Sequence, residues 1–269
     1  MIGKIARFFS NDWKTTPIFF PTIGKLVLVI ALLAGAAPAQ AQPPDGEQLM
    51  MRVRAALPYI PLRITGELQS RDRRGNIVRV NPVEMELDWG AEPPTALYVI
   101  RDRFGEETER LEIAWRPGAP AEYTYAQGDP PEPVALEDLN RPIDGLNLDW
   151  ADLSLSFLWW SGARVVGSER VRGRFCYIVD IPAPENEVTR YAGVRLWIDP
   201  ETSLLMQADA YDARNRPLRR LQVKSLRKID DIWMVQNLDI VDHATRERVT
   251  LRVRRVRALD DSFEEEWDS

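Results

Sequence analysis

The sequence predicts a mainly β protein with an antiparallel sheet. About a dozen segments alternate apolar and polar residues with a period of two, and only two segments show the 3.6-residue period of a helix. A helix about 10 Å wide covers only about two strands that lie ~4.8 Å apart, so two helices cannot cover an open sheet of this width. The sheet must therefore curl on itself, pack as a sandwich, or keep an apolar hollow for a ligand.

Residues 1–41 are predicted to form a secretory signal peptide. A basic leader precedes an apolar run over 26–37, and Ala39-Gln40-Ala41 then has the small-x-small pattern of a signal peptidase site. We expect cleavage between Ala41 and Gln42. The alternative is an uncleaved N-terminal anchor, although the apolar run is shorter than the ~20 residues that a membrane span needs.

Composition favours one exported domain over 42–259, followed by an acidic, disordered tail over 260–269. The whole chain has a formal net charge of −6, and the predicted signal peptide removes more positive than negative charge. So acidic a body is a poor partner for nucleic acid. The single cysteine, Cys176, excludes an internal disulfide, so stability must come from a hydrophobic core. These features are typical of a periplasmic protein.

The first half of the domain is predicted to begin with a short helix and continue as strands. The helix covers 45–57, with Asp45 as its N-cap and Pro58 ending it. Met85 and Leu87 belong to the clearest alternation in the chain, in which their neighbours are acidic. The predicted strands are 60–67, 83–89, 96–101, 108–115 and 123–126. A proline-rich acidic loop over 128–145 follows.

The second predicted helix, over 149–160, has the sequence DWADLSLSFLWW and is apolar nearly all round. Asp149 suits the N-cap and Gly162 suits the C-terminal end. Strand patterns flank this helix on both sides. It must therefore be buried by those strands or by something that they hold.

The rest of the domain is predicted to be a train of strands joined by short turns, which makes neighbours antiparallel. These strands are 163–170, 175–181, 191–199, 203–212, 218–226, 232–241 and 248–257. Two groups of arginines are expected on the solvated outer face of the sheet, with phosphate head groups or an acidic partner as the alternative contacts. They are Arg214, Arg216, Arg219 and Arg220, and Arg252, Arg254, Arg255 and Arg257.

Four stretches resemble the LolA-like family, whose members are labelled periplasmic outer-membrane lipoprotein-sorting proteins. They are DLSLSFLWW, GSERVRGRFCYIVDIP, YAGVRLWIDPETSLLMQADAYD and KSLRKIDDIWMVQNLDIVD, and the resemblance covers about 136–256, and more loosely the strands from residue 60 onward. It implies a strongly curved, unclosed antiparallel half-barrel with a few helices plugging its concave face, as in LolA and LolB.

The resemblance also implies a function. A LolA-like protein would act as a lipid or lipoprotein carrier and chaperone that sequesters acyl chains in an apolar hollow for lipoprotein sorting or lipid transfer. Its partners would be an acylated lipoprotein or lipid, together with an inner-membrane transporter or an outer-membrane receptor. The alternative is a periplasmic sensor or adaptor module that binds a membrane protein or exporter through the same fold.

Large aromatic side chains and flexible thioethers are suited to line such a hollow, because they accept chains of varied shape. The alternative is that they form a plain core. The candidate residues are Trp89, Trp115, Leu155, Leu158, Trp159, Trp160, Trp197, Met206, Trp233 and Met234. With one histidine and one cysteine, the sequence offers no Cys/His metal cluster and no conventional catalytic triad. We therefore expect a protein that is not an enzyme and needs no cofactor.

Overall fold

A computed structural model describes residues 44–116, 119–135, 139–185, 187, 189–229, 232–260 and 264–266. The described residues belong to one compact unit, Pro43–Ser269. The predicted signal peptide over 1–41 lies outside the described residues. No helix in the described ranges combines the length and hydrophobicity that a membrane crossing requires.

The predicted N-terminal helix is confirmed as α1, Gly46–Ala55. The Asp45 side chain accepts a hydrogen bond of 3.0 Å from the backbone N–H of Gln48, which satisfies one of the free amides at the helix start. Leu49, Met50 and Val53 are buried on one face. This face attaches α1 to the rest of the core.

Fourteen strands, counted over the described ranges, form one antiparallel sheet. In chain order they are β1 (Leu62–Arg71), β2 (Ile77–Asp88), β3 (Thr95–Arg101), β4 (Glu107–Ala114), β5 (Glu122–Gly128), β6 (Pro131–Pro133), β7 (Arg164–Val171), β8 (Arg174–Pro182), β9 (Gly193–Asp199), β10 (Leu204–Tyr211), β11 (Pro217–Ile229), β12 (Ile232–Asp242), β13 (Arg248–Ala258) and β14 (Glu264–Glu266). The predicted strands are all present. β2 begins six residues earlier than predicted, and β6 is an additional strand in the predicted 128–145 loop.

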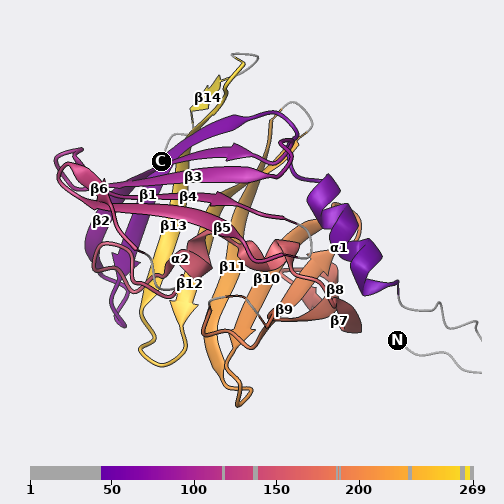
Figure 1. The fold of residues 1–269 in the computed structure, drawn as a ribbon. Helices are drawn as coiled ribbons and strands as arrows, with labels where there is room; N and C mark the ends of the chain where they lie inside the picture. Colours follow the sequence, from indigo (N-terminus) through magenta and orange to yellow (C-terminus); the bar gives the residue numbers. More distant parts are fainter. Residues whose placement is uncertain are drawn as a thin grey trace, which may run out of the picture. The chain divides into compact units, whose positions relative to one another are not determined.

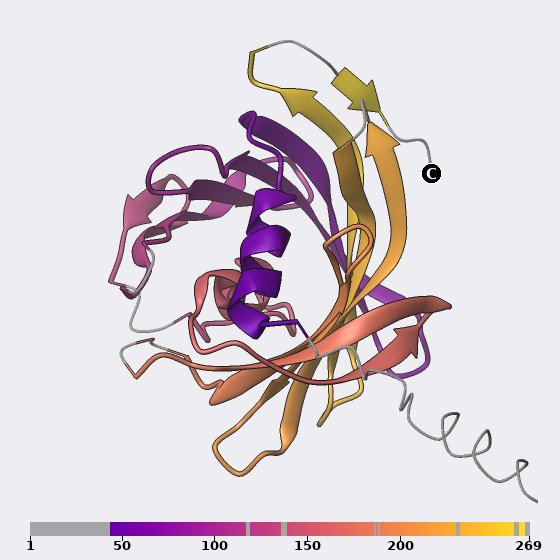
Figure 2. The ribbon, with the colours of Figure 1, turned by 90° about the vertical axis from the view of Figure 1, so that its right-hand side faces the viewer.

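The sheet is strongly curved and does not close. Its strands follow the order β6-β5-β4-β3-β2-β1-β13-β12-β11-β10-β9-β8-β7, with β14 added to β13. Two half-sheets therefore meet in the middle, where β1 pairs with β13, and β6 and β7 form the outer edges (Figure 1). Viewed from the side, the sheet wraps around the helices, which lie on its concave face (Figure 2). The predicted half-barrel is confirmed.

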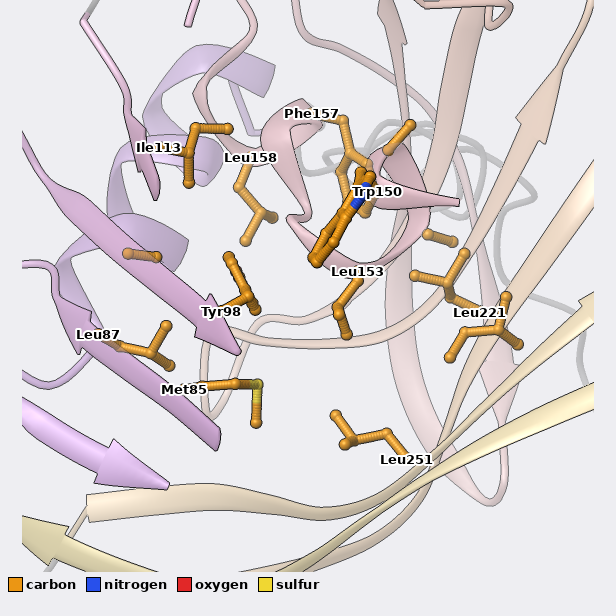
Figure 3. Packing of buried hydrophobic residues seen from close by; sticks show 14 of the residues in the cluster. Met85, Leu87, Tyr98, Ile113, Trp150, Leu153, Phe157, Leu158, Leu221 and Leu251 are labelled. Carbon is orange, nitrogen blue, oxygen red and sulfur yellow. The ribbon is translucent and has the colours of Figure 1, made fainter. Parts of the chain in front are cut away.

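Alternation along the strands separates an apolar inner face from a charged outer face. In β9, for example, Val194, Leu196 and Ile198 are buried in the main core, whereas Arg195 points outward and pairs with Asp180 at 2.7 Å. Side chains from β2, β3, β11 and β13 converge with those of the central segment on one interior space (Figure 3). This space is where the candidate site lies.

The prediction of a single central helix over 149–160 is wrong. The structure has one α-helical turn, α2 (Trp150–Leu153), and then a 3₁₀ turn, η2 (Ser156–Trp159). Leu155 between them has a positive φ of 52°, a left-handed conformation that breaks the helix. The Ser154 and Ser156 hydroxyls lie 3.0 Å apart, and the Trp115 indole N–H donates to Ser156 Oγ. These side-chain bonds stabilise the break.

Part of the predicted loose tail is ordered as a strand. Glu264–Glu266 form β14, which pairs antiparallel with Arg255, Val256 and Arg257 of β13. Residues 261–263 and 267–269 lie outside the described residues.

Candidate functional site

An apolar cavity of about 180 Å³ lies between the curved sheet, α1 and the α2–η2 segment. Few polar atoms line the cavity, because the strands present their apolar inner faces to it. The helical walls are Val53, Ala56, Leu57, Pro58, Leu153, Ser154, Leu155, Leu158 and Trp159. The sheet walls include Ile64, Met85, Leu87, Trp89, Tyr98, Leu204, Leu205, Met206, Leu221, Val223, Trp233, Met234, Val235, Leu238, Leu251 and Val253.

Seven of the ten residues that the sequence singles out line this cavity. They come from four separate parts of the chain and are Trp89, Leu155, Leu158, Trp159, Met206, Trp233 and Met234. Inward residues of β2, β3, β11 and β13 were not among the candidates, although the period of two in those strands marks them. Met85, Leu87, Leu221 and Leu251 are examples, and Figure 3 shows them around the same space.

The other three candidates lie elsewhere. Trp115 and Trp160 line a smaller neighbouring cavity of about 80 Å³, which Trp159 also borders. Trp115 stacks on Trp159 with ring centroids 4.2 Å apart, and Trp159 borders both cavities. Trp197 lies in a separate cluster with Val171, Cys176 and Met206. Its indole N–H donates to Glu169 at 3.0 Å.

Helix α1 is attached to the end of the α2–η2 segment by polar contacts as well as apolar ones. Glu47 Oε1 accepts hydrogen bonds from the backbone N–H groups of Gly162 and Ala163, at 2.5 and 2.8 Å. Arg54 Nη1 donates to the Leu158 carbonyl oxygen at 2.9 Å. Burial lowers the pKa of Arg54, and the negative charge of Glu47 acts in the opposite direction. These bonds hold α1 across one end of the cavity.

The other end of the segment, α2, is fixed by a buried network of charges around Arg219. The Arg219 guanidinium is 2% exposed and contacts Asp152 at 3.0 Å, Asn147 at 3.0 Å and Asp242. The expectation that Arg219 lies on the solvated outer face is therefore wrong. In β11, Arg219 alternates in phase with the buried Leu221, so its side chain points inward.

Two further residues complete this network. Arg190 pairs with Asp149, the N-cap of α2, at 2.5 Å, and the Tyr191 hydroxyl donates to Asp152. Burial, followed by the negative charge of Asp152, raises the pKa of Tyr191 well above its usual value, so the hydroxyl keeps its proton and remains a donor. Asp152 also accepts the backbone N–H of Asp149 at 3.1 Å. Moving α2 away from the sheet would separate Asp149 and Asp152 from their arginine partners.

A second inward charge fixes the loop before α2. Glu109 of β4 is 2% exposed and accepts the Tyr125 hydroxyl at 2.8 Å and the Asp144 backbone N–H at 2.6 Å. Burial raises the pKa of Glu109, and these two hydrogen bonds oppose that rise. The Asp144 carboxylate in turn forms an ion pair with Arg79, with 2.7 Å between nitrogen and oxygen.

The site is built for apolar contact. Among the residues that the structure describes, no group of three His, Cys, Asp or Glu side chains is placed to hold a metal ion. Cys176 is buried, and burial raises the pKa of its thiol to about 11, which keeps it in the unreactive protonated form at neutral pH. What the cavity offers is a surface for hydrocarbon.

Comparison with known proteins gives a family and a fold. A family model described as "Uncharacterized protein" matches residues 131–266. No curated protein matches the chain. A DUF1329 family protein from Desulfovibrio piger superimposes with a TM-score of 0.68 at 17% identity, covering 80% of this chain and 92% of that one.

Two more solved structures have the same fold. A putative outer-membrane lipoprotein-sorting protein domain from Vibrio parahaemolyticus has a TM-score of 0.69 and 13% identity, covering 82% of this chain and 94% of its own. A LolA superfamily protein from Nitrosomonas europaea has a TM-score of 0.62 and 11% identity, with coverages of 84% and 96%. The predicted resemblance to the LolA-like fold is confirmed.

Proposed function

This chain belongs to the family described as "Uncharacterized protein", and we propose that it is a periplasmic, non-enzymatic carrier that shelters an acyl chain in its interior cavity. The observation that carries this proposal is the apolar cavity of about 180 Å³ that lies between the sheet and the helices. The acyl chain would belong to a lipoprotein or a lipid. An inner-membrane transporter or an outer-membrane receptor would then be the protein that delivers or accepts it.

The size of the cavity limits what it holds without rearrangement. An engineered apolar cavity of about 150 Å³ in another protein binds benzene, so a cavity of similar size takes a short stretch of hydrocarbon. Each buried methylene contributes about 0.8 kcal/mol. A longer chain needs the walls to move, and the half-buried Leu155 and Trp159 are wall residues that lie next to the helix break.

The comparisons support this function through the fold. A putative lipoprotein-sorting domain shares the curved sheet, and the curved sheet with too few covering helices is what leaves the cavity. Export is supported by the predicted signal peptide over 1–41.

Acyl binding is tested by placing a polar group on the cavity wall without straining the backbone. Asparagine tolerates a positive φ better than most residues, so Leu155→Asn adds an amide to the cavity while keeping the local conformation. We expect it to weaken binding of a fluorescent fatty acyl probe by roughly tenfold, because burying an unpaired amide costs about 1–3 kcal/mol.

The matched control is Leu218→Asn, because Leu218 is also half-buried against the main core but does not line the cavity. It should leave probe binding unchanged. Native mass spectrometry of protein purified from a bacterial periplasm identifies any lipid that it retains. Protein that carries no lipid and fails to bind the probe would overturn the carrier function and favour the adaptor alternative.

A further inference from the structure

The sheet parts between two neighbouring strands, β12 and β13. Their ladder runs from Val241 paired with Arg248 to Asn237 paired with Arg252, and ends there although both strands continue in the described residues. Beyond that point β12 stays paired with β11, and β13 stays paired with β1. The two halves of the wall therefore diverge.

Register shifts in both flanking strand pairs lie beside the point where β12 and β13 diverge. The β11–β12 register shifts on both sides of Ser225, and the β1–β13 register shifts between Thr65 and Gly66. Each bulge bends and twists its strand locally. A Cβ on Gly66 would lie 2.4 Å from the Arg252 carbonyl oxygen, so the second bend needs glycine at this position.

The cavity has walls on both sides of the parting. Trp233, Met234 and Val235 of β12 line it on one side, and Val253 of β13 lines it on the other. These are the segments that no longer pair with each other. A chain passing between the two strands would therefore reach the cavity without crossing a helix.

β14 lies at this parting. β1 occupies one edge of β13, so β14 pairs with the other edge, at Arg255, Val256 and Arg257. If the β12 ladder continued in register, its residues Met234, Trp233 and Ile232 would lie opposite these same three positions. β14 thus takes the place that β12 leaves free.

The polar side-chain contacts that hold β14 are exposed ones. Arg255 lies 3.3 Å from Glu264 and 3.0 Å from Glu266, and all three side chains are more than two-fifths exposed. Water and salt screen such pairs. The α2 end of the interior segment is held instead by the buried Arg219 network, which resists opening. Of these two elements, β14 is the easier to move.

We propose that β14 is a displaceable strand beside the parting between β12 and β13, and that acyl chains enter and leave between these two strands when it detaches. This inference rests on the proposed carrier function and adds its route. Detachment changes access and not the cavity itself. Rates of binding and release should therefore change together, and affinity should change little.

A disulfide that fixes β14 in place tests the proposal in the full chain. Arg257→Cys with Glu264→Cys joins residues that are register partners, and it leaves the Arg255–Glu266 pair intact. Oxidation should slow entry of a fluorescent fatty acyl probe several-fold in stopped flow, and reduction should restore the rate. Glu112→Cys with Thr124→Cys, register partners in β4 and β5, is the matched control and should show no redox dependence.

Weakening the same contacts should have the opposite effect. In Glu264→Gln with Glu266→Gln, entry should be faster than in the wild type at low salt, and the wild-type rate should rise toward it as salt is added. Entry that is equally fast in the oxidised and reduced disulfide variants would overturn the route while leaving the carrier function intact. A wild-type protein that binds no probe would overturn both.

Discussion

Two elements, α2 beside the cavity and β14 at the parting between β12 and β13, are both held by arginine–carboxylate pairs but in opposite surroundings. The Arg219–Asp152 pair is 2% and 0% exposed, whereas Arg255 is 45% exposed and its glutamates are more so. A buried charge that loses its partner remains uncompensated, but an exposed one is solvated at once. The same chemistry therefore fixes α2 and leaves β14 easy to release.

The largest expected effect comes from breaking the buried pair. Arg219→Ala should lower the free energy of unfolding by about 3–5 kcal/mol, because it leaves Asp152 as a buried carboxylate without its cation and removes the arginine partner of Asp242. Urea denaturation measures this. Arg216→Ala removes an exposed arginine from the same segment and should leave the midpoint almost unchanged. Equal shifts of the urea midpoint in the two variants would show that the buried and the exposed arginine contribute equally to stability.

Glu109 gives a smaller effect that depends on pH. Burial raises its pKa in the folded protein, so its stabilising contribution is full below the unfolded pKa and is lost as pH rises through the folded value. Glu109→Gln cannot titrate. Measured by urea denaturation, the stability of the wild type relative to this variant should therefore increase as pH falls from 7 towards 4. A constant difference would show that the pKa of Glu109 is the same in the folded and unfolded states.

The smallest effect is expected at β14. Glu264→Gln with Glu266→Gln should change the free energy of unfolding by less than about 0.5 kcal/mol, because its ion pairs are exposed. Urea denaturation at low and high salt checks this. A loss comparable to that of Arg219→Ala would show that β14 is firmly attached to β13.

The strands could be predicted from the sequence because their inner and outer faces differ so sharply. The same period of two also carried information that the prediction did not use. Arg219 is in phase with Leu221, and Glu109 is in phase with Leu111, so both charges lie on inner faces. A charged residue in the apolar phase of a strand marks a buried anchor, and both of these anchors hold the chain around α2.

The break in the central segment was harder to predict. Its apolar residues fit a helix, and only Asp152 and two serines interrupt them. The break is stabilised in part by the indole N–H of Trp115, which donates to Ser156 across 41 residues of sequence. Trp197 was misplaced for a simpler reason, since it alternates with Val194, Leu196 and Ile198 and so faces the other side of the sheet. Contacts between distant residues, and the choice of inner face, are set by the assembled sheet.

The pairing of β1 with β13 has a consequence for how the protein folds. Glu67 and Arg254, which meet across this pair at 3.2 Å, are separated by 187 residues. Closing so long a loop costs conformational entropy before the contacts between its ends can stabilise it. Folds dominated by pairings between distant residues therefore form slowly. Each half-sheet is built from local hairpins and can assemble first. The core shared by the two half-sheets can form only after β13 has been synthesised and has paired with β1.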